Sequence, residues 1–155
     1  MRLQAFYIDR YEVTNQQYKD FVDAAGQRQP GHWFNGTFPN ANIADHPVVN
    51  VSWEDATAFA VWGGKYLPTE AESERAARGE RNSDYPWGRI AVAQENANFG
   101  NPRGGISPVA KFEDGKSQFG VWDISGNAGE WVNDWYEGNY FASSANDDPK
   151  GSSEG

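Results

Sequence analysis

Residues 119–136 read FGVWDISGNAGEWVNDWY. Large aromatic side chains flank a turn of small residues at 125–129 and are expected to be buried: Trp122, Trp131, Trp135 and Tyr136. A glycine-rich turn can bring backbone carbonyls, the amide oxygen of Asn127 and the carboxylate of Glu130 to one point, and calcium prefers such a cage of oxygens. The alternative is a structural turn in which Glu130 only bonds local backbone, because the spacing matches no EF-hand loop. Both interpretations stay open at this point.

Composition limits the classes of protein to consider. The chain has 155 residues, about the size of one domain, and its 17 glycines and seven tryptophans predict a loop-rich fold held by aromatic anchors. The net charge of −9 argues against binding to nucleic acid or to an anionic membrane, and it is compatible with bound cations. No apolar run approaches membrane-spanning length. These features leave the cellular location undetermined.

The sequence contains no cysteine. This chain therefore offers no disulfide, no thiolate metal ligand and no thiol nucleophile. The histidines, His32 and His46, have no partner histidine at ligand spacing, so we expect them to be loop residues. Adjacent acids such as Asp147 and Asp148 lie in turn-like contexts and predict solvated charges rather than a general acid and base. We predict no catalytic residue in this chain.

Capping boxes predict the starts of helices, and glycines predict their ends. The boxes pair Thr14 with Gln17, Ser52 with Asp55 and Thr69 with Glu72. The stop signals are Gly26, Gly63 and Gly79. Residues 3–8 and 47–51 have strand-like patterns, and residues 27–45 have the composition of an ordered loop. The overall pattern is mixed α and β with long loops.

The opening stretch also carries a resemblance. Residues 120–131 resemble the GLYDMxGNVWEW signature of the formylglycine-generating enzyme family, the sulfatase-modifying factors. Further blocks of that family occur in the same order at residues 5–15, 46–56, 67–72 and 97–100. The resemblance covers roughly residues 3–136 and departs at Ser73 and Arg75, where the family has aromatic residues.

The resemblance implies a fold and a domain arrangement. The expected fold class is α+β, an irregular C-type-lectin-like or sulfatase-modifying-factor fold with few short helices, an antiparallel sheet and long loops. Residues 1–136 would form a partial domain without the family's N-terminal strand and C-terminal cysteine region, and residues 137–155 a polar loop or tail. A sheet without its terminal strands would expose edges, so a homo-oligomer is one expectation.

The resemblance also implies two sites for structural calcium. In the first, Asn98 by its side chain and Phe99 by its carbonyl would be ligands, with Asn101 and Arg103 as further candidates by position. The second would use the side chains of Asn127 and Glu130. Its backbone carbonyl ligands would come from Ser125, Gly126 and Ala128. For each site a turn without an ion remains the alternative.

Three functions follow as hypotheses. The first is a calcium-stabilised, non-catalytic member of the family that binds a protein or peptide ligand. The second is part of a formylglycine-generating oxidase acting on sulfatase cysteines, completed by another chain or by further residues. The third is a carbohydrate-binding lectin, which is disfavoured because no Glu-Pro-Asn triplet occurs. Copper is not expected in this chain, because copper(I) sites need thiolates.

Overall fold

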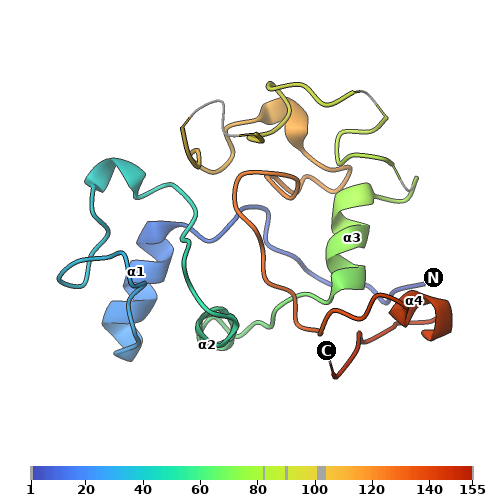
Figure 1. The fold of residues 1–155 in the computed structure, drawn as a ribbon, viewed down its shortest axis with the longest axis horizontal. Coiled ribbons are helices and arrows are strands. Elements are labelled where there is room, and N and C mark those ends of the chain that lie inside the picture. Colours follow the sequence, from blue (N-terminus) through green and yellow to red (C-terminus); the bar gives the residue numbers. More distant parts are fainter. Residues whose placement is uncertain (1, 82, 90, 101–103, 155) are drawn as a thin grey trace.

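The structure is a computed structural model that describes residues 2–81, 83–89, 91–100 and 104–154. Its α-helices are α1 (Asn15–Ala25), α2 (Trp53–Trp62), α3 (Glu70–Arg78) and α4 (Tyr140–Ser143). Two short 3-10 helices, η1 (Ala41–Ile43) and η2 (Glu113–Gly115), lie in the loops between them. Figure 1 shows α1 at one end of the molecule and α4 at the other, joined by long irregular segments.

Local hydrogen bonds fix where the three longer helices begin, as the sequence predicts. Each of the capping boxes at Thr14, Ser52 and Thr69 has both of its reciprocal bonds. A capping box satisfies backbone N–H groups that would otherwise lack a partner at a helix start. The three helices end at the predicted glycines, and Gly26 takes the left-handed conformation with φ of 64°.

The predicted antiparallel sheet is not seen. Among the described residues there are isolated β-bridges, such as Thr14 with Pro47 and Trp135 with Ser152, but no β-strand. Residues 3–8 and 47–51 contain no assigned strand. A strand-like pattern predicts an extended segment, but a β-strand also needs a second extended segment beside it for hydrogen bonding. Only the tertiary structure decides whether such a segment is present.

Aromatic rings form the core between α1, α2 and the loop that joins them. Tyr18 and Phe21 of α1 are almost fully buried, with Trp33 from the loop beside them. Phe59 of α2 stacks on Tyr18 at 5.7 Å between ring centroids and meets Phe21 edge-on at 5.5 Å. Such pairs add about 0.5–1.5 kcal/mol each beyond the burial of their area.

The stretch 119–136 runs partly over the surface, contrary to the expectation that its aromatic residues are buried. Trp122 is 7% exposed, but Trp131, Trp135 and Tyr136 are 49%, 63% and 81% exposed. Trp131 donates its indole N–H to the carbonyl of Val51, at 3.1 Å. The Trp131 ring therefore lies at the start of α2, where it stays accessible while its indole N–H is bonded.

Residues 140–154 lie against distant parts of the chain. The backbone N–H of Arg2 donates to Asn146, and that of Asp148 donates to Arg2. Tyr140 accepts the N–H of Gly151 on its hydroxyl at 2.9 Å. Figure 1 shows the N-terminus beside α4. In the part of the chain that is described, no helix has the length and apolar character needed to cross a membrane.

Candidate functional site: a buried polar network at the 125–130 turn

A buried glutamate anchors the turn at residues 125–129. Glu12 precedes α1 and is 8% exposed. Its two carboxylate oxygens accept from the side-chain amide of Asn127 at 2.7 Å and from the backbone N–H of Ala128 at 3.0 Å. The start of α1 is thus tied to a turn more than a hundred residues later.

Asn127 is the centre of this network. Its amide oxygen accepts from the backbone N–H of Ser107 at 2.8 Å and from the side-chain amide of Asn98 at 3.2 Å. Its own backbone N–H donates to the carbonyl of Asn98 at 2.9 Å. Asn127 has φ of 56°, a left-handed conformation that Asn tolerates better than most residues. An asparagine therefore suits this position, because it tolerates the left-handed backbone and its side chain makes the hydrogen bonds of the network.

The close approach of two chain segments explains the glycine before it. A Cβ at Gly126 would lie 2.7 Å from the carbonyl oxygen of Asn98, and Gly126 has φ of 112°. Both facts exclude an unstrained side chain here. The contact brings together Asn98 and the 125–128 turn, which the sequence analysis assigned to two separate sites.

Burial also shifts the acids around the turn. Desolvation raises the pKa of Glu12 to about 8, against the hydrogen bonds from Asn127 and Ala128, which lower it. Desolvation, and then the charge of Asp123, raise the pKa of Glu130 to about 7. Desolvation likewise raises the pKa of Asp123, whose carboxylate accepts the N–H of Ala110 at 2.8 Å. No cationic side chain contributes to any of these three pKa shifts, so the three carboxyl groups lie near one another without a compensating positive charge.

Glu130 differs from Glu12 in two respects. Among the described residues no hydrogen-bond donor or ion-pair partner contacts its carboxylate, and the residue as a whole is exposed. Protein atoms surround the carboxyl group, although the residue as a whole reaches solvent. An unpaired, partly desolvated carboxylate is chemically suited to a cation.

The residues predicted as calcium ligands thus fall into distinct positions. Asn98, Gly126, Asn127 and Ala128 come together in one network, with the amide oxygen of Asn127 occupied by two N–H donors. Phe99 follows Asn98 and is 42% exposed. Ser125 is half-buried beside Gly126, while Asn101 and Arg103 lie outside the described residues.

The described residues contain no group of three or more His, Asp or Glu side chains that could hold a metal ion. A calcium ion would therefore depend on Glu130 together with carbonyl oxygens. A ligand role for the amide oxygen of Asn127 would require that it give up a bond to Ser107 or Asn98. Both predicted calcium sites stay predictions.

Sequence reasoning missed Glu12, Ser107 and Asp123. Glu12 carried a usable signal, because it is an acid flanked by Tyr11 and Val13 within a block that matches the family. Ser107 and Asp123 gave none, since one contributes backbone atoms to the network and the other follows a tryptophan in an apparent loop.

Comparisons with known proteins place this site in a family. The sequence profile of the family described as sulfatase-modifying factor enzyme 1-like domain matches residues 1–153. The chain belongs to this family. The residues of the network, from Glu12 to Ala128, all lie within the matched sulfatase-modifying-factor domain.

Relatives of the domain have several names. The formylglycine-generating enzyme of Thermomonospora curvata is 32% identical, with 92% of this chain and 64% of that protein covered. Hercynine oxygenase of Mycobacterium tuberculosis is 32% identical over 83% of this chain and 37% of its own length. Serine/threonine-protein kinase Pkn1 of Chlamydia trachomatis is 34% identical over 92% of this chain and 25% of its own.

A solved structure supports the fold. PvdO from Pseudomonas aeruginosa superposes with a TM-score of 0.70 at 27% identity, with 94% of this chain and 62% of that chain covered. The sulfatase-modifying-factor fold predicted from the sequence is thereby supported, although the antiparallel sheet is absent from the described residues. The chain spans less than two thirds of the length of the T. curvata enzyme and of PvdO.

Proposed function

We propose that this chain is a calcium-stabilised, formylglycine-generating-enzyme-like domain that does not carry out an oxidase reaction with its own residues. The observation that carries the proposal is a family domain whose polar centre holds carboxylates and amides but no thiol. A copper(I) oxidase site needs thiolate ligands, and this sequence contains no cysteine.

Calcium would act at the 125–130 turn by neutralising Glu130. The ligands in this proposal are the Glu130 carboxylate and the carbonyls of Ser125, Gly126 and Ala128, with Asn98 and Phe99 serving a first site. A bound divalent cation would supply the positive charge that the surrounding carboxylates lack. Glu12 and Asn127 would hold the turn in place from the buried side.

A thermal melt with calcium and with excess chelator tests this proposal. Binding to the folded state alone raises the melting temperature, and the rise continues as the free calcium concentration increases above the dissociation constant. We expect Glu130→Ala to abolish the rise caused by calcium, and Glu137→Ala, which removes an exposed acid seven residues away, to preserve it. If the melting temperature of the parent chain is the same with calcium and with chelator, the calcium proposal is refuted.

The same melt assigns the role of Asn127. If Asn127→Ala lowers the melting temperature equally with calcium and with chelator, its side chain serves the network alone. If the variant also loses the calcium response while it remains folded, the side chain is a ligand.

A second candidate, supported by the similarity to the T. curvata enzyme, is a part of an oxidase that acts on sulfatase cysteines. Copper and thiolates would then come from residues outside this chain. Oxygen uptake with a cysteine-containing sulfatase peptide and copper, measured with and without a second polypeptide that carries the missing thiolates, distinguishes the candidates. Turnover that needs both polypeptides would support the second candidate, and turnover by this chain alone would refute the first proposal.

A further inference from the structure

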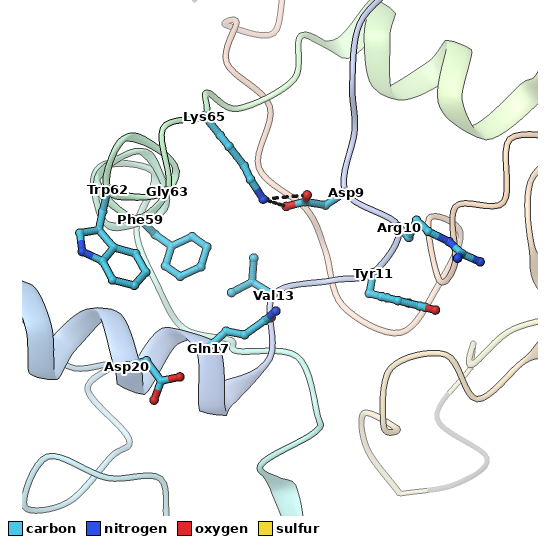
Figure 2. A pocket seen from close by; sticks show the side chains of 10 residues that line it. All are labelled: Asp9, Arg10, Tyr11, Val13, Gln17, Asp20, Phe59, Trp62, Gly63 and Lys65. Carbon is cyan, nitrogen blue, oxygen red and sulfur yellow. Dashed lines mark hydrogen bonds and ion pairs between the residues drawn. The ribbon is translucent and has the colours of Figure 1, made fainter.

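A pocket lies between α1, the end of α2 and residues 9–13 (Figure 2). It has a volume of about 360 Å³, which is within the range of small-molecule sites. It is lined by residues that take no part in the network around Glu12.

One wall of the pocket is apolar and rests on the core. Val13, Phe59 and Trp62 line it, and Figure 2 shows the side chains of Phe59 and Val13 facing the space between α1 and Lys65. The rings of Phe59 and Trp62 are 6.0 Å apart, and both pack on buried Phe21. Trp62 is nevertheless 49% exposed, so part of its ring remains available to a ligand.

The positive charges at the pocket already have partners. Lys65 donates to both carboxylate oxygens of Asp9 at 2.8 Å. The Nε of Arg10 donates to the carbonyl of Gly120 at 3.4 Å, and Figure 2 shows Arg10 pointing away from Phe59 and Trp62. An anionic ligand would thus have to compete with Asp9 for Lys65 and with the carbonyl of Gly120 for Arg10.

Asp20 on α1 supplies the available charge. One oxygen of its carboxylate accepts from the side chain of Gln16 at 2.9 Å. Its other oxygen has no hydrogen-bond or ion-pair partner among the described residues. Asp20 is exposed and lines the pocket, so its carboxylate is available to accept hydrogen bonds from a ligand.

We propose that this pocket binds a primary alkylammonium group, an ammonium at the end of a flexible aliphatic stem. The stem would lie on Val13, Phe59 and Trp62, and the ammonium would bind Asp20. The aromatic faces and the chain's net charge of −9 add attraction for a cation.

Titration with matched ligands tests the proposal. The probes are pentylamine, its uncharged analogue 1-pentanol, and Nα-acetyl-lysine amide, which presents the same group from a peptide. The readout is the NMR shift of the Trp62 indole N–H, assigned with Trp62→Phe. Asp20→Asn removes the charge while keeping the oxygen that Gln16 binds, and Asp23→Asn is the control on the same helix, since Asp23 pairs with Lys19.

We expect both amines to shift the Trp62 signal with saturation, and 1-pentanol to bind at least about fivefold more weakly. Asp20→Asn should weaken the amines by a similar factor, whereas Asp23→Asn should bind them like the parent chain. Saturation by pentylamine but not by acetyl-lysine amide would assign the site to free amines rather than to peptides. Equal binding of 1-pentanol, no shift at Trp62, or an Asp20→Asn chain that binds normally would each overturn the proposal.

Discussion

The hydrogen bonds of Asn127 should stabilise the fold by several kilocalories per mole, and Asn127→Ala measures this directly. The substitution removes the acceptor for the N–H groups of Ser107 and Asn98 and the donor to Glu12. An unpaired buried group costs about 1–3 kcal/mol, and an ordinary hydrogen bond contributes about 0.5–1.5 kcal/mol. Because water would recover part of this, we expect a loss of about 3–5 kcal/mol from the network.

Asn35→Ala is the matched control for the backbone. Asn35 has φ of 50°, close to the 56° of Asn127, so both substitutions place alanine in a left-handed conformation. Asn35 is exposed, and its side chain has no hydrogen-bond partner among the described residues. The control should therefore cost only about 1 kcal/mol, and the difference between the variants isolates the network.

Equilibrium unfolding in urea, followed by tryptophan fluorescence in the presence of chelator, provides the two free energies of unfolding. Equal slopes in urea would show that both variants unfold from comparably compact states. A cost for Asn127→Ala within about 1 kcal/mol of the cost for Asn35→Ala would refute the reasoning. The hydrogen bonds of Asn127 would then stabilise the fold no more than bonds from water to the same groups. Domains are stable by only about 5–15 kcal/mol, so the expected loss is large enough to measure.

Two further predictions concern the same turn. The pKa of Glu12 is about 8 in the folded state against an ordinary 4.5, so its contribution to stability is complete below pH 4.5 and is lost as the pH rises through about 8. The urea midpoint of the parent chain should fall as the pH rises through this window, and that of Glu12→Gln should fall less. Midpoints that depend on pH equally in both chains would contradict the raised pKa of Glu12. Gly126→Ala should cost about 2–4 kcal/mol, because its Cβ meets the Asn98 carbonyl at positive φ, and an unchanged melting temperature would disprove that contact. Gly129→Ala, with nothing within 4 Å of its Cβ, is the control.

The helices were predictable because their signals are local. Thr14 and Gln17 bond each other across three residues, and this geometry depends only on the chain between them. The same holds for the Glu74 and Arg78 ion pair, which lies one helical turn apart at 2.7 Å. Family membership was also predictable, because the sequence blocks of the family and their order can be recognised from the sequence alone.

The departure at Arg75 shows a case that sequence could not decide. An aromatic residue of the family is absent there, and the sequence left open what covers the helix. In the structure the Arg75 guanidinium lies over the ring of Phe119, at 5.6 Å, and its side chain donates to the carbonyl of Gly79. At this position a cation packed on an aromatic ring stands where the resemblance predicts an aromatic residue.

The sequence by itself determined the helix boundaries, the family and the absence of thiol chemistry from this chain. Tertiary structure alone decided that Glu12 meets the 125–129 turn, that Asn98 and Asn127 share one network, and that the strand-like segments lack partners among the described residues. The physical reason is the range of the interactions. A helix cap closes within one turn of chain, whereas a buried carboxylate or a β-ladder depends on a partner that only the folded chain brings near.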